Sequence, residues 1–82
     1  MQASPHVAWQ IVAGEAILVD LQTGRTLGLN SVGTAIWSHL DKGSRSGIVE
    51  EIVREFDVTP TQAARDVEEF LSKLERRGLL RA

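Results

Sequence analysis

The hydrophobic pattern changes its period once, at Asn30-Ser31, and this change limits the folds open to the chain. Before the junction, apolar and polar residues alternate, which is typical of half-buried strands. After it, apolar residues recur at intervals of three and four, which is typical of amphipathic helices. The order predicts an α+β fold, in which a three-stranded antiparallel sheet is followed by three helices.

Three short strands are expected, and they span residues 6–13, 16–21 and 25–30. Turn residues separate them, with Gly14 in the first connection and Gly24 in the second. Tight turns between consecutive strands favour an antiparallel meander. Residues 1–5 carry no periodic pattern and are expected to form a frayed tail. Both tryptophans are large apolar groups, and we expect Trp9 in or beside the core and Trp37 at the rim of the packed stripe.

The first helix is expected to begin at Asn30 or Ser31 and to end over residues 41–43, with Gly43 as its C-terminal stop. Ser46 is the expected cap of the second helix. A stripe of apolar residues follows it at helical spacing, namely Ile48, Val49, Ile52, Val53 and Phe56.

The third helix has the clearest start signal in the chain. Thr59 is its expected cap, Pro60 its first helical residue, and Gln62 completes a capping box. We expect it to run to about Arg77 and to end at Gly78. Leu79 and Leu80 can then fold back onto the core. Because the last two helices are joined by a short turn, they could form a helix-turn-helix.

Length and composition indicate one small domain spanning residues 1–82. The chain has no cysteine, which excludes disulfides and thiolate metal sites and favours a cytoplasmic location. No apolar run approaches the roughly 20 residues of a membrane span. The N-terminus lacks the basic-then-apolar order of a signal peptide. The net charge of −2 gives no reason to expect a polyanionic partner.

No cluster of residues with the spacing of a catalytic site is evident. His6 and His39 are the only histidines, and no serine and acid follow either of them in a pattern that would form a triad. A metal site needs three or four ligands, and the carboxylates are scattered. Gly24, Gly28 and Gly33 do not have the spacing of a phosphate loop. We therefore expect a protein that is not an enzyme and has no cofactor and no metal.

DNA binding by the third helix is disfavoured by its charge. A reading helix must neutralise phosphates with several basic residues. Over residues 60–77 the charges sum to zero, and the second helix is acidic. A small winged-helix regulator that binds DNA nevertheless stays open as the alternative function. The charged residues counted over 60–77 are Arg65, Lys73, Arg76 and Arg77 against Asp66, Glu68, Glu69 and Glu75.

A peptide-binding groove fits the pattern better. The third helix sets Phe70 at the edge of its apolar arc, beside Lys73 and Arg77, which point together because they are four residues apart. The third strand offers an edge to which an extended peptide can add, and Gly28 permits close approach. Two other interpretations remain open. In the first, the third helix is an ordinary amphipathic helix with a solvated outer face. In the second, the third strand pairs with another copy of the chain in a weak homodimer.

The stretch from Leu18 to Gly24 (LVDLQTG), the stretch from Leu29 to Trp37 (LNSVGTAIW) and the run from Ala64 to Leu71 (ARDVEEFL) resemble the PqqD-like family. Leu74 and the closing Arg77-Gly78-Leu79-Leu80 continue this resemblance, which extends over nearly the whole chain in the family's order. The resemblance implies a winged-helix-like RiPP recognition element. Such proteins bind the leader segment of a ribosomally synthesised precursor peptide and present it to a modifying enzyme.

The family's partners include radical SAM enzymes and leader peptidases, and its leader adds as a strand beside the third strand and packs against the third helix. Carried onto this chain, the resemblance implies one wall on the third strand and one on the third helix. The strand wall would comprise Arg25, Thr26, Leu27, Gly28 and Leu29, and the helix wall Phe70, Lys73, Leu74 and Arg77, with Val67 and Leu71 either lining the groove or holding the core.

Overall fold

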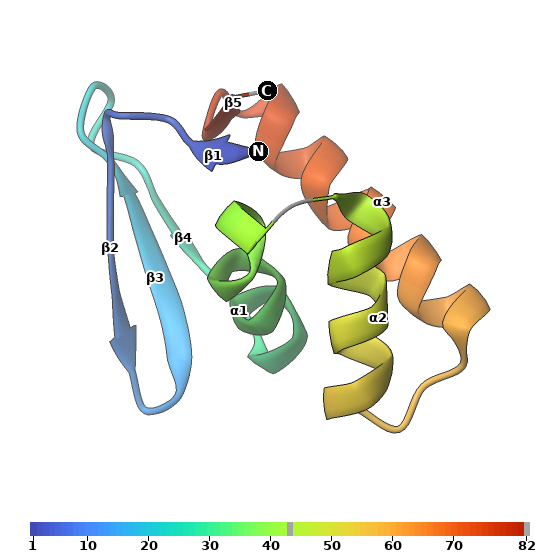
Figure 1. Ribbon diagram of the computed structural model, residues 1–82. Helices are drawn as coiled ribbons and strands as arrows, with labels where there is room; N and C mark the ends of the chain where they lie inside the picture. The colour runs from blue at the N-terminus through green and yellow to red at the C-terminus, as the bar shows by residue number, and fades with distance from the viewer. Residues whose placement is uncertain (43, 82) are drawn as a thin grey trace.

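The computed structural model describes residues 1–42 and 44–81, and it packs a small sheet against a layer of helices (Figure 1). The sheet is antiparallel in the order β2-β3-β4, and the helices follow it in the chain. This confirms the predicted α+β order of a three-stranded sheet followed by three helices. The elements are β2 (Val7–Val12), β3 (Glu15–Asp20), β4 (Thr26–Gly28), α1 (Ser31–Ser38), the 3-10 turn η1 (Leu40–Lys42), α2 (Arg45–Glu55) and α3 (Pro60–Arg76).

One hydrophobic core lies between the sheet and the helices. From the sheet, Ala16 and Leu18 point into it, because alternate residues of a strand face the same side. The neighbouring Ile17 faces outward and is 37% exposed. No helix in the described parts of the chain is long and apolar enough to cross a membrane. The helices and the C-terminal segment supply most of the remaining core, including Ile36, Ile48, Ile52, Val67, Leu71, Leu74 and Leu79.

The expectation of a frayed tail is wrong. Strand β1 (Gln2–Ala3) pairs antiparallel with strand β5 (Leu80–Arg81). Beside them, Ser4 is only 8% exposed, and its N–H and hydroxyl donate to the carbonyls of Leu79 and Gly78 at 3.0 and 2.9 Å. The two ends of the chain therefore hold each other, which Figure 1 shows above the helices. Pairing between residues this far apart leaves no periodic signal in so short a segment.

The starts of the helices agree with the sequence more closely than their ends. Asn30 caps α1, and its Oδ1 accepts from the Gly33 N–H at 2.8 Å. Helix α1 ends at Ser38, earlier than predicted, and η1 follows it. The expected stop at Gly43 lies outside the described residues. Ser46 was the wrong cap for α2, because Ser44 accepts from the Gly47 N–H.

The start of α3 fulfils half of the predicted capping box. The Thr59 hydroxyl accepts from the Gln62 N–H at 3.1 Å, and Pro60 is the first helical residue. The Gln62 side chain donates to Asp66 at 2.8 Å, instead of reaching back to the cap. The helix ends as expected, since Gly78 follows it with a φ of 71°.

Trp37 lies in the core rather than at the rim of the packed stripe, and Trp9 lies beside the core but is more exposed than expected. Trp37 is buried at 4% exposure, whereas Trp9 is 50% exposed. Their rings meet edge to face, with centroids 6.1 Å apart. Strand β2 lies farthest from the helices in Figure 1, so the core-facing side of β2 extends beyond the helical layer. Trp9 packs one edge on Trp37 and leaves the rest open.

Candidate functional site

The outer edge of β4 is unpaired among the described residues, because β4 contacts only β3 in the sheet. Asp20 donates its N–H to the Arg25 carbonyl, and Leu29 donates to the Ala16 carbonyl. Since bonded residues alternate along an antiparallel strand, Leu27 also turns its backbone groups toward β3. The N–H and C=O groups of Thr26 and Gly28 therefore point outward, and they can accept a further strand.

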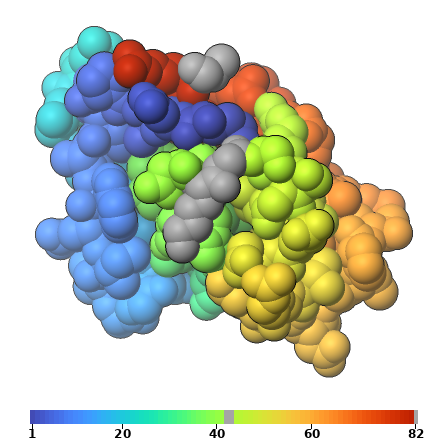
Figure 2. All heavy atoms as spheres, in the orientation of Figure 1, coloured from blue at the N-terminus to red at the C-terminus, as the bar shows by residue number. Residues whose placement is uncertain are grey.

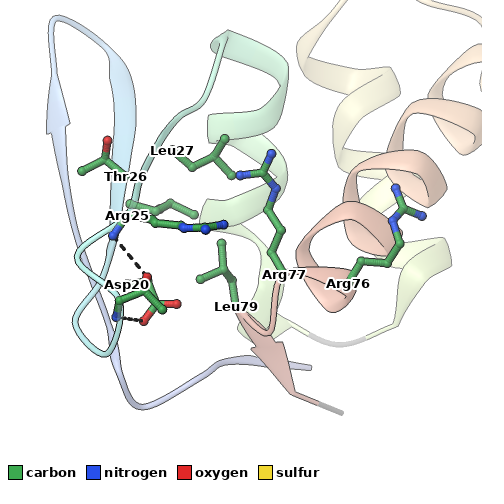
Figure 3. A pocket seen from close by; sticks show the side chains of 9 residues that line it. Asp20, Arg25, Thr26, Leu27, Arg76, Arg77 and Leu79 are labelled. Carbon is green, nitrogen blue, oxygen red and sulfur yellow. Dashed lines mark hydrogen bonds between the residues drawn. The ribbon is translucent and has the colours of Figure 1, made fainter.

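A hollow of about 450 Å³ lies between this edge and the C-terminal end of α3. Figure 3 shows Arg25 and Leu27 extending into it from the strand side, and Arg77 and Leu79 from the helix side. Its base is apolar and its rim is cationic. The residues that line it are Leu18, Asp20, Thr23, Arg25, Thr26, Leu27, Arg76, Arg77 and Leu79.

The β3–β4 turn fixes Arg25 at one side of the hollow. The Asp20 carboxylate accepts from the Gln22 N–H at 2.9 Å, and its carbonyl accepts from the Gly24 N–H at 2.7 Å. Gly24 has a φ of 77°, which a residue with a Cβ rarely adopts. The Thr23 hydroxyl then accepts from the Arg25 N–H. These bonds fix the backbone of Arg25, from which its side chain extends into the hollow (Figure 3).

The end of α3 fixes the opposite wall through a Schellman motif. The N–H of Gly78 donates to the Glu75 carbonyl, and that of Leu79 to the Leu74 carbonyl. This arrangement reverses the chain directly after Arg77 and returns Leu79 to the core at 5% exposure. Arg77 and Leu79 consequently face the same hollow.

A second hollow, of about 330 Å³, lies further along α3, against α1. Phe70 and Lys73 line it together with Asn30 and Gly33. A Cβ built on Gly33 would lie 3.1 Å from the Phe70 ring, so α1 approaches α3 closely only because this residue is glycine. The Asn30 cap and the Gly33–Phe70 contact therefore hold the strand edge and the helix wall at a set distance.

The junction at Asn30-Ser31 ties three elements together. Besides the Asn30 cap, the Thr34 hydroxyl of α1 accepts from the Ala16 N–H of β3 at 2.9 Å. The next residue before the junction, Leu29, donates to Ala16 from the end of β4. The end of β4 is thereby anchored to β3 and to α1.

The structure separates the predicted site residues into two groups. Arg25, Thr26 and Leu27 line the first hollow with Arg77, and Phe70 and Lys73 line the second. The backbone N–H and C=O of Gly28 point to the outer edge of β4, and no atom lies within 4 Å of a Cβ built on it. The others are at most 6% exposed and lie in the core, so they support the walls from behind rather than lining them: Leu29, Val67, Leu71 and Leu74.

Arg76 is a lining residue that the sequence reasoning missed. Helical spacing alone puts it beside the neighbouring Arg77 but about 100° away around the axis. Its position in the last turn before Gly78 could have identified it, because that end of the helix borders the hollow. With Arg25 and Arg77 it makes this end of the site cationic, whereas Asp66 and Glu69 bring negative charge to the second hollow.

A separate group of possible metal-binding side chains lies between the end of α1 and helix α2. His39, Glu51 and Glu55 offer ligand atoms within 4.8 Å of one another. The His39 Nε2 is already hydrogen-bonded to Glu55 at 2.7 Å, and Arg54 pairs with Glu51. The His39 Nδ1 is buried with no hydrogen-bond partner among the described residues, whereas a ligating histidine usually donates its second ring N–H. The group forms one local hydrogen bond and one ion pair, and it does not resemble a built metal site.

The fold and the site define a winged-helix-like α+β domain with a free strand edge beside its last helix. The chain belongs to the PqqD family, since the family described as coenzyme PQQ synthesis protein D matches residues 15–80. This confirms the resemblance found in the sequence. No curated protein matches the chain.

Two solved structures have the same fold. One is TbiB1 in complex with the TbiA(beta) leader peptide, which is 35% identical, covers all of this chain and 96% of its own, and has a TM-score of 0.91. The other is a lasso peptide synthetase B1 complexed with the leader peptide, which is 23% identical and has a TM-score of 0.86. The alignment with the latter covers 95% of this chain and 93% of the other, and at this identity it supports the fold alone.

Proposed function

We propose that this protein is a RiPP recognition element that binds the leader segment of a precursor peptide as an additional strand on β4. The observation that carries the proposal is the edge of β4, unpaired within the described chain, beside a hollow with an apolar base and a cationic rim. The likeness to TbiB1, whose structure contains a leader peptide, supports it.

Backbone pairing at β4 would set the register of the leader. Two leader residues would exchange hydrogen bonds with Thr26 and Gly28, and the leader residue between them would lie opposite Leu27. Because opposite residues in a sheet share a face, the side chain of that central residue would enter the hollow between Leu27 and Leu79. The leader residues on either side of it would point to the outer face, where Gly28 leaves room.

Noncovalent contacts alone can hold such a complex, without a covalent bond to the leader. Each backbone hydrogen bond contributes about 1 kcal/mol net. An apolar leader side chain buried against Leu27 or Phe70 contributes about 1–2 kcal/mol. Ion pairs at exposed Arg25, Lys73 or Arg77 add about 0–1 kcal/mol each, and they chiefly speed the association of acidic leaders. Micromolar affinity corresponds to about 8 kcal/mol net, so several of these contacts must act together and exceed the cost of ordering the leader.

The role that we propose is that of a non-catalytic adaptor. The bound leader would be presented to a modifying enzyme, such as a radical SAM protein or a leader peptidase. An added strand orders only the leader residues that pair with β4. The rest of the precursor, including the segment that is to be modified, would remain unpaired and accessible to a separate modifying enzyme.

DNA binding finds less support. Helix α3, which would have to enter the major groove of DNA, exposes Glu68 and Glu75. The Arg45 guanidinium binds both carboxylates, at 2.9 and 2.8 Å, so that this cation is already neutralised. A duplex would meet a helix face without excess positive charge.

The groove assignment is tested by comparing two substitutions on α3. Phe70→Ala removes an aromatic wall of the second hollow, and we expect leader binding to weaken by about 2 kcal/mol, or about thirtyfold. Glu68→Ala is the matched control, since Glu68 lies on the Arg45 side of the same helix. Titration calorimetry with a synthetic leader peptide measures both. Equal affinities for the two variants would remove Phe70 and the second hollow from the binding site.

A further inference from the structure

Strand β2 presents a second free edge, on the opposite side of the sheet from β4. It is unpaired on its outer side in the part of the chain that the structure describes. Its six residues, VAWQIV, contain no charge and no proline. Natural edge strands usually carry lysine, proline or a bulge that prevents pairing with other chains. The sequence of β2 has none of these features, which indicates that the edge pairs with something.

The outward backbone groups of β2 can be assigned in the same way as those of β4. Leu21 donates its N–H to the His6 carbonyl, so His6 turns its carbonyl toward the next strand. By alternation, Ala8 and Gln10 also bond to β3. The outward backbone groups therefore belong to the odd residues, which are Val7, Trp9 and Ile11. The Val7 N–H already donates to the Ser4 carbonyl at 3.1 Å, so Val7 offers only its C=O, whereas Trp9 and Ile11 offer both groups.

Two of these odd residues carry exposed apolar side chains on the core-facing side of the sheet. Trp9 is 50% and Ile11 48% exposed, beyond the limit of the helical layer. An exposed tryptophan and isoleucine beside an unprotected edge form a surface that is both apolar and rich in unused hydrogen bonds. Figure 2 shows β2 and β3 projecting as a ridge on the left face of the molecule.

We propose that β2 pairs with β2 of a second copy of this chain, antiparallel and around a twofold axis through Trp9. In this register Trp9 lies opposite Trp9 of the second copy, and Val7 lies opposite Ile11. In this register the two Trp9 residues exchange hydrogen bonds, and the Ile11 N–H of each strand donates to the Val7 carbonyl of the other. A shift by two residues in either direction would bring Pro5 or the turn residue Ala13, whose φ is 52°, into the paired segment.

The occupant is a second copy because the edge is self-complementary. Neither strand brings a charge to the contact, so nothing opposes self-pairing. One short strand buries less than the roughly 800 Å² per partner of a standard interface, so the dimer forms weakly and depends on concentration. The two sheets join through β2, and both β4 edges stay free. On the function proposed above, the dimer would hold two leaders.

Sedimentation velocity from low micromolar to millimolar concentration tests the dimer. The mass of the natural chain should rise from 9.0 kDa toward twice that value. Ile11→Lys should weaken dimerisation by at least about tenfold, since it places a charge at the paired edge. The matched control is Leu21→Lys, because Leu21 is 66% exposed but lies outside the paired segment, and it should dimerise normally. A chain that stays monomeric at every concentration, or equal effects of the two lysines, would overturn the proposal.

Amide hydrogen exchange separates this proposal from the function of β4. Raising the protein concentration alone should slow exchange at Trp9 and Ile11, while Thr26 and Gly28 exchange as before. If the Trp9 amide is protected only when a modifying enzyme is added, the β2 edge serves a different partner and self-pairing is wrong. Leader affinity should be the same for Ile11→Lys and the natural chain, so either proposal can fail without the other.

Discussion

Gly28→Pro is the substitution that isolates backbone pairing at β4. The N–H of Gly28 points outward, so its loss leaves the hydrogen bonds between β3 and β4 intact. Proline is tolerated in an edge strand on the side that faces solvent. The preceding Leu27 is already extended, as a residue before proline must be. The proline ring should therefore remove one donor from the edge with little effect on the fold.

The expected loss follows from that one donor. A leader carbonyl that meets the proline ring is desolvated without a hydrogen bond, which costs about 1–3 kcal/mol. Leader affinity should fall by about 5- to 150-fold. Gly28→Ala is the control, because no atom lies within 4 Å of a Cβ built there and the N–H remains. Titration calorimetry gives the affinities, and thermal unfolding checks the fold. Equal affinity of the proline and alanine variants, with both folded, would refute strand addition at β4.

Three further predictions concern the walls of the site. Gly33→Ala should displace the Phe70 ring, which would lie 3.1 Å from the new methyl group, and reduce leader affinity; an unchanged ring environment in aromatic NMR spectra would contradict the packing argument. Gly78→Ala should lower the free energy of unfolding by about 1 kcal/mol, because φ there is 71°, and denaturant unfolding measures it; unchanged stability would count against the C-cap geometry. Arg77→Glu should slow association with an acidic leader at low salt and much less at high salt; stopped-flow rates independent of salt would exclude steering by this residue.

The sequence predicted the elements that local chemistry determines. The change of period at Asn30-Ser31 and the cap at Thr59 correctly marked the starts of α1 and α3. Gly78 correctly marked the end of α3. These signals lie within a few residues of the boundary that they set. The pairing of β1 with β5 had no such signal, because its two strands lie at opposite ends of the chain.

The site was predictable in position but not residue by residue. Periodicity put Leu71 and Leu74 on the apolar arc of α3, but it could not separate a residue that lines a groove from one beneath it. That distinction depends on the spacing of α3 from β4, which the Gly33–Phe70 contact sets. Likewise, the exposure of Trp9 depends on how far the sheet extends beyond the helices, which the strand pattern does not encode.

Residue-specific amide exchange in a complex saturated with leader peptide tests the central claim most directly. Thr26 and Gly28 hold the outward N–H groups of β4, whereas Leu27 and Leu29 already donate to β3. Binding should slow exchange strongly at Thr26 and Gly28, and the amides of Leu27 and Leu29 should change far less. If Thr26 and Gly28 exchange as fast in the saturated complex as in the free protein, the leader does not add to this strand.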